Sequence, residues 1–195
     1  MKFTQMDRRK ALQNIGTGIG AISITPSVVS LFQSCQSASN YIPVYFNTSD
    51  FQKISQLMEL IIPTTDIPGA IELKLPEFTD SYIAAVWDSK RQDNFSSKLQ
   101  SFLTVSSEIS GENVDQMSIS DWDAILAKLL KPENEILQEE KEAESFAKEL
   151  RSLTINAFKT NEFICENILA YAPVPGEQKG CVDLMKTTGG KAWSL

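Results

Sequence analysis

Apolar residues recur at steps of three and four along most of the chain, a spacing typical of amphipathic α-helices. The first helix is expected to begin at Ser49, which forms a capping-box pattern with Gln52, and to stop before Pro63. A second helix is expected to begin at Pro76, because the first helical position leaves its N–H unbonded and proline has none. The expected buried stripe of this second helix is Phe78, Tyr82, Ile83, Val86 and Trp87.

Four further helices are expected after the second, each with apolar residues on one face. No run of alternating apolar and polar residues has the length of a strand. The pattern therefore predicts an all-α protein, with a single compact helical domain over residues 49–195. It would contain about five to six helices and an irregular C-terminal tail. The expected ranges of the later helices are 93–109, 120–131, 133–158 as the longest, and a last helix capped by Thr160.

Two segments lack helical spacing: the turn-rich loop between Pro63 and Pro68, and the tail from residue 170 onward. The loop does not have the glycine spacing or the Lys-Ser/Thr pair of a phosphate-binding loop. A long irregular tail needs a surface to lie against. That surface is either the chain's own helices or a partner, since aromatic side chains commonly anchor interfaces. The candidate partner-interface residues are Pro63, Pro68, Tyr171, Pro175 and Trp193.

The first 35 residues have the layout of an export signal. Arg8 and Arg9 precede a mildly apolar run that is rich in Gly and Ser. The paired arginines indicate the twin-arginine route, although Asp7 and Ala11 depart from its usual motif. A transmembrane anchor is the alternative, but it needs about 20 predominantly apolar residues. We therefore expect residues 1–35 to direct export.

Cys35 follows a small residue, Ser34, at the end of this signal, as in a bacterial lipoprotein processing site. There the thiol would be acylated and the chain cut before it. The alternative is an ordinary cleavage nearby. Lipidation would make residues 36–48 a polar tether that holds the domain at the periplasmic membrane surface without spanning the membrane.

Composition narrows the classes of function. The chain carries 18 basic and 25 acidic residues; without residues 1–35 it keeps 14 and 24, a net charge of −10. Such a surface repels phosphate backbones, so nucleic acid is not an expected partner. The chain contains no histidine, which excludes Ser-His-Asp and Cys-His nucleophile systems and His-based metal or haem sites. We therefore expect no catalytic, cofactor-binding or metal-binding residues.

Two other features each allow two interpretations. Cys165 and Cys181 could form a disulfide in an oxidising periplasm, or stay apart as a buried and a loop thiol; their spacing does not decide. The acidic run 139–144 could bind a metal or form a solvated helix face. The solvated face is expected, because hard cations usually draw their oxygens from a compact loop.

Motifs at both ends of the helical domain resemble those of the gluconate 2-dehydrogenase subunit 3 family. The N-terminal motif runs from Leu60 to Ala70 and continues at 75–78 as Leu-Pro-Glu-Phe. The C-terminal motif comprises Tyr-Ala-Pro-Val-Pro-Gly at 171–176, Lys-Gly-Cys at 179–181 and the closing Lys-Ala-Trp-Ser-Leu. The resemblance covers roughly residues 49–195, and the helices between the motifs are generic.

The resemblance implies a non-catalytic small subunit. In this family such a subunit pairs with a large, FAD-dependent dehydrogenase of the glucose-methanol-choline type, and a cytochrome c often takes the electrons onward. The large subunit commonly lacks its own export signal and leaves the cytoplasm with the small one. The competing expectation is a free-standing periplasmic lipoprotein that binds a surface or ligand without an enzyme partner.

Overall fold

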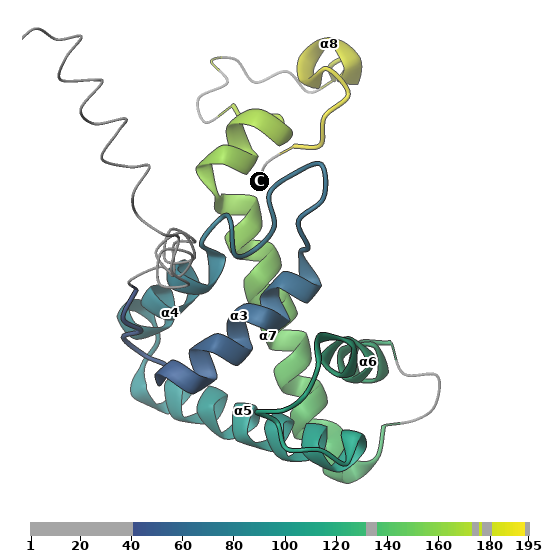
Figure 1. The fold of residues 1–195 in the computed structure, drawn as a ribbon. Coiled ribbons are helices and arrows are strands. Elements are labelled where there is room, and N and C mark those ends of the chain that lie inside the picture. Colours follow the sequence, from purple (N-terminus) through teal and green to yellow (C-terminus); the bar gives the residue numbers. More distant parts are fainter. Residues whose placement is uncertain (1–40, 132–135, 173–175, 177–180, 194–195) are drawn as a thin grey trace, which may run out of the picture. The chain divides into compact units, whose positions relative to one another are not determined.

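The computed structural model describes residues 41–131, 136–172, 176 and 181–193. The chain divides into two units, Met1–Tyr41 and Ile42–Leu195, and the second unit is helical. Within the described residues there is no strand, and Ala170 and Trp193 form an isolated parallel bridge. The prediction of an all-α domain is confirmed. Its elements are α3 Thr48–Ile61, α4 Leu75–Val86, α5 Ser89–Ser110, α6 Ile119–Leu130, the 3-10 helix η1 Gln138–Glu140, α7 Lys141–Thr160, the π-helix η2 Ile164–Ile168 and α8 Leu184–Thr188 (Figure 1).

Helix α7 is the centre of the helical unit, and α3, α4, α5 and α6 all pack against it (Figure 1). The buried face of α7 includes three small residues, Ala143, Ala147 and Ala157. Phe146 lies on the same face: its ring lies 5.1 Å from that of Phe95 and 5.0 Å from that of Phe102. Both partners belong to α5, so one aromatic side chain joins the central helix to the longest one.

Asp80 ties the start of the folded unit to α4. Its buried carboxylate accepts hydrogen bonds from the backbone N–H groups of Val44 at 2.7 Å, Tyr45 at 3.0 Å and Phe46 at 2.8 Å. A buried carboxylate needs such partners, because burying an unpaired charge is costly. The bonds place the ring of Phe46 in the core, 6.3 Å from that of Phe95. The folded unit therefore already includes residues 42–48, which the sequence assigns to a polar tether.

Tyr45 makes a second attachment between this segment and α5. Its hydroxyl donates to the carbonyl of Gln92 at 2.7 Å and lies 2.8 Å from the Ser96 hydroxyl. Burial raises the pKa of the Tyr45 phenol above its ordinary value of 10.0. The phenol therefore keeps its proton at neutral pH and remains a donor.

Four helices begin earlier than the sequence predicts: α4 begins at Leu75 and α5 at Ser89, and α3 and α6 also have N-caps other than the expected ones. The N-cap of α3 is Asn47, whose side chain accepts from the N–H of Asp50, so the expected Ser49 cap is wrong. The N-cap of α6 is Ser118, which forms a capping box with Asp121, so the expected start at Ser120 is also wrong. In both α3 and α6 the N-cap lies two residues before the expected position. An acidic residue three positions after the N-cap, Asp50 or Asp121, accepts a hydrogen bond from the N-cap residue.

The predicted buried stripe of α4 is wrong for three of its five residues. Ile83 and Trp87 are buried, but Phe78, Tyr82 and Val86 are 51%, 38% and 60% exposed. The inward line of α4 instead includes Thr79 and Asp80. Asp80 must face inward to bind the backbone of residues 44–46. With the helix in this orientation, Phe78, Tyr82 and Val86 face solvent.

The chain from residue 138 onward also differs from its prediction. Instead of one helix from 133 to 158 there are η1 and then α7, and α5 is the longest helix of the described residues, with 22 residues. Glu140, from the acidic run expected to be solvated, is buried and pairs with Lys128 at 2.6 Å. Thr160 ends α7 and does not cap a new helix; Asn161 accepts from the N–H of Ile164 at the start of η2.

The Asp80 attachment gives a stability prediction. Replacing Asp80 by Ala orphans three backbone donors, and we expect the free energy of unfolding to fall by about 3 kcal/mol or more. Asp123→Ala is the matched control, since Asp123 is exposed on α6 and should change stability by less than about 0.5 kcal/mol. Denaturant unfolding of both variants tests this. An unchanged midpoint for Asp80→Ala would show that the attachment does not stabilise the fold.

Candidate functional site

The loop between α3 and α4 is held closed by one side chain, Glu59. One of its carboxylate oxygens accepts from the N–H of Thr64 at 3.0 Å and the hydroxyl of Thr64 at 2.9 Å. The other accepts from the N–H of Ile71 at 2.8 Å, and the N–H of Ala70 bonds the carbonyl of Ile62 at 2.9 Å. The loop that carries Pro63 and Pro68 is therefore a fixed shape and not a loose connection.

Gly69 is required by this closure. A Cβ at residue 69 would lie 2.5 Å from a Glu59 carboxylate oxygen and 2.5 Å from both the N and the hydroxyl oxygen of Thr64. Such distances are well inside van der Waals contact. The glycine thus lets backbone and carboxylate approach each other, and its role in the loop is steric.

The C-terminal tail returns to the end of α7. The N–H of Ala170 donates to the carbonyl of Ala192 at 2.7 Å, and the Lys191 amine donates to the carbonyl of Asn167, in η2, at 2.8 Å. The side chains of Tyr171 and Trp193 nevertheless remain 51% and 49% exposed. The loop before α4 reaches the same end of α7, where the Asn161 amide donates to the carbonyl of Leu73 at 3.4 Å.

The predicted interface residues thus have different outcomes. Pro63, Tyr171 and Trp193 are exposed and Pro68 is half-buried, at segments that both join the end of α7 (Figure 1). Whether they contact a partner stays a prediction. Pro175, Arg8, Arg9 and Cys35 lie outside the described residues.

Of the two alternatives left open for Cys165 and Cys181, the described residues show no disulfide: both are free thiols. Cys165 is buried in η2, and its thiol donates to the carbonyl of Lys159 at 3.0 Å. Cys181 is exposed, in the segment before α8. The structure therefore corresponds to the second alternative, a buried thiol and a separate loop thiol.

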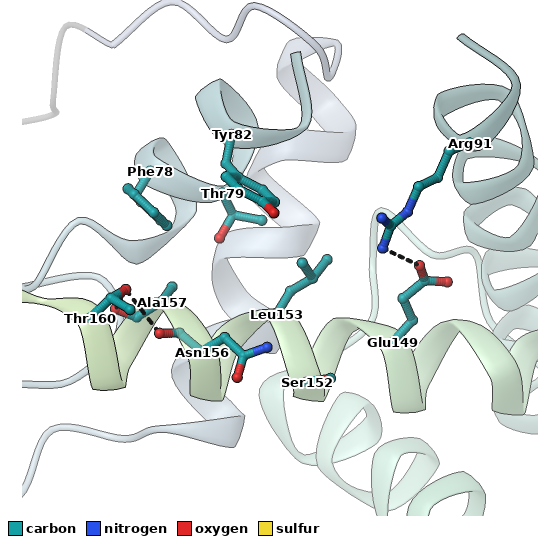
Figure 2. Close-up of a pocket in the computed structure, with 10 residues that line it drawn as sticks. All are labelled: Phe78, Thr79, Tyr82, Arg91, Glu149, Ser152, Leu153, Asn156, Ala157 and Thr160. Atoms are coloured by element: carbon teal, nitrogen blue, oxygen red, sulfur yellow. Dashed lines mark hydrogen bonds and ion pairs between the residues drawn. The ribbon is translucent and has the colours of Figure 1, made fainter. Parts of the chain in front are cut away.

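A groove of about 290 Å³ lies between α4 and α7, and the sequence does not predict it. Figure 2 shows Phe78 and Tyr82 from α4 on one side of it, opposite residues of α7. The rings of Phe78 and Tyr82 stack with centroids 6.1 Å apart. The remaining lining residues are Thr79, Arg91, Glu149, Ser152, Leu153, Asn156, Ala157 and Thr160.

Two polar groups stand out in the groove. The Thr79 hydroxyl is buried and has no hydrogen-bond partner among the described residues, which is uncommon for a buried polar atom. Arg91 stacks on the Trp87 ring, with its guanidinium carbon 3.9 Å from the ring centroid. Its distance to the Glu149 carboxylate is 3.8 Å, whereas Lys98 contacts that carboxylate at 3.1 Å.

Sequence reasoning missed Thr79, Arg91 and Glu149. No local signal was available, because the outward position of the apolar residues of α4 depends on Asp80 facing inward. Among the described residues no group of three or more His, Cys, Asp or Glu side chains could hold a metal ion. No helix within the described ranges is long and apolar enough to cross a membrane.

The closed loop gives a second stability prediction. We expect Gly69→Ala to lower the free energy of unfolding by about 1–3 kcal/mol, because its methyl group overpacks the Glu59 contacts. Asp66→Ala, at an exposed position of the same loop, should change it by less than about 0.5 kcal/mol. Thermal or denaturant unfolding measures both. Equal stability of the two variants would contradict the steric role of Gly69.

Comparison with known proteins assigns the chain to a family. The model of the family described as gluconate 2-dehydrogenase subunit 3 matches residues 48–176. This range starts at the first residue of α3, contains the loop closed by Glu59 and the α4–α7 groove, and ends in the tail. No curated protein and no solved structure matches the chain. The match covers about two thirds of the chain, and it confirms that the protein belongs to the gluconate 2-dehydrogenase subunit 3 family.

Proposed function

We propose that this chain is the non-catalytic small subunit of a flavin-dependent dehydrogenase that oxidises a sugar or sugar acid. The observation that carries the proposal is the family match over residues 48–176, because the family is named as a subunit of a dehydrogenase. FAD and the oxidation belong to a large partner subunit, and a cytochrome c is a candidate acceptor of its electrons. The small subunit binds the folded large subunit and stabilises it by mass action.

The chemistry of the chain supports a binding role. It contains no histidine, so no side chain has an unperturbed pKa near neutrality to serve as a general base. Exposed aromatic side chains are present instead, at Phe78 and Tyr82 on α4 and at Tyr171 and Trp193 in the tail. Aromatic residues of this kind are enriched in protein–protein interfaces.

The N-terminal residues would determine where in the cell the complex is located. The Arg8-Arg9 pair would direct the folded pair of subunits through the twin-arginine route, a route that suits a cargo already folded around its cofactor. Lipid on Cys35 would then hold the complex on the periplasmic side of a membrane, close to the electron acceptors. The chain would in this way supply the export signal, the lipid anchor and the binding surface for the large subunit.

Co-export predicts where the activity is found. In cells carrying Arg8→Lys with Arg9→Lys, we expect most of the dehydrogenase activity to stay in the cytoplasm, because the signal loses its arginine pair. Lys10→Arg is the matched control, since it keeps both arginines and the same charge. Dye-linked activity in separated cytoplasmic and periplasmic fractions is the measurement. Normal periplasmic activity in the double variant would refute co-export.

Lipidation predicts a separate change. In Cys35→Ser we expect the chain to move from the membrane fraction to the soluble periplasmic fraction and to lose incorporation of labelled palmitate. Cys181→Ser changes the exposed thiol of the tail and should leave both properties as in the wild type. Continued membrane association of Cys35→Ser would rule out the thioether lipid as the anchor.

A further inference from the structure

We infer that the α4–α7 groove is the socket for an apolar side chain of the dehydrogenase's large subunit, carried on a segment that also presents a carboxylate to Arg91. The inference rests on the proposed function and adds to it the place and the chemistry of the contact. The lining residues of the groove do not include the predicted interface residues Pro63, Pro68, Tyr171 or Trp193.

The lining of the groove suits an apolar side chain. Small-molecule sites usually have volumes of about 300–1,000 Å³, and this groove, at about 290 Å³, lies just below that range. Its apolar walls come from Phe78 and Tyr82 on one side and Leu153 on the other (Figure 2). A pocket of this kind accepts one anchoring residue, as at the centre of many protein interfaces.

The Thr79 hydroxyl belongs to the buried wall of the groove. Thr79 lines the groove and is only 2% exposed, and its oxygen has no hydrogen-bond partner in the part of the chain that the structure describes. Figure 2 shows this oxygen pointing into the space between α4 and α7. Leaving a buried hydroxyl unbonded costs free energy.

Arg91 supplies the charge that selects the partner. Stacking on Trp87 fixes its guanidinium at the groove, and the nearer partner of Glu149 is Lys98. Several of the five guanidinium N–H donors therefore remain available, in a geometry that matches a carboxylate. The chain has a net charge of −7, so the positive charge of Arg91 at the groove is opposite in sign to that of the protein as a whole. An acidic residue beside the anchoring side chain of the partner is complementary to it.

The groove can be tested by altering it from both sides. Tyr82→Asp places a charge on its apolar wall, Arg91→Glu reverses its cation, and Ser152→Trp fills it from an exposed position on α7. Each variant of the tagged full-length chain is produced together with the large subunit and purified through the tag. The large subunit recovered per tagged chain is measured, and the dissociation constant is determined by titration.

We expect each of the three variants to weaken binding by about tenfold or more, as for residues at the centre of an interface. Two controls should stay within about twofold of the wild type, the usual size of a surface effect. Lys90→Glu makes the same charge change next to Arg91, and Ile119→Asp makes an exposed apolar residue of α6 acidic. Melting temperatures of the variants show that the fold is intact.

The outcomes separate the two proposals. If the wild-type chain does not retain the large subunit, the proposed function fails. If the wild type retains it, but the three groove variants bind as tightly as the two controls, the accessory role stands and the socket is wrong. Since Ser152→Trp only adds atoms at an exposed position, its result decides the matter even if one of the other variants unfolds.

Discussion

The buried carboxylate of Asp80 is the interaction on which the rest of this domain depends. It accepts the backbone N–H groups of three consecutive residues, Val44, Tyr45 and Phe46, and so fixes the entry of the chain into α3 against α4. Phe46 is thereby placed beside Phe95, whose ring contacts Phe146 on the central helix α7. A single charged group thus aligns three helices, because a buried carboxylate cannot exchange these donors for water.

The same constraint determines which surface the domain offers to others. With Asp80 and Thr79 facing inward, the line of Phe78 and Tyr82 must face outward. These two rings border the groove next to α7, and Arg91, stacked on Trp87, adds a cation to it. Stability and recognition are therefore linked in α4: the residue that holds the fold together turns apolar side chains to the outside. In a subunit of a dehydrogenase, such a surface supports our proposal of a partner-binding role.

The sequence allows much of the fold to be predicted, and the errors have physical causes. Periodic apolar residues and the stop at Pro63 identify the long helices, because these signals are local. The choice between adjacent stripes on α4 depends on what Asp80 binds 34–36 residues away, which no local pattern encodes. The groove was missed for the same reason. The steric role of Gly69 likewise depends on Glu59, a residue of the preceding helix.

The central claim is that this chain works as a binding subunit of a flavoprotein dehydrogenase. Its most direct test is affinity purification of the tagged full-length protein from native membranes, followed by the visible absorption spectrum and the subunit bands of the eluate. The account predicts a flavin spectrum together with a much larger co-purifying polypeptide that oxidises a sugar or sugar acid. A colourless, folded, single polypeptide would contradict it and would favour a free-standing lipoprotein.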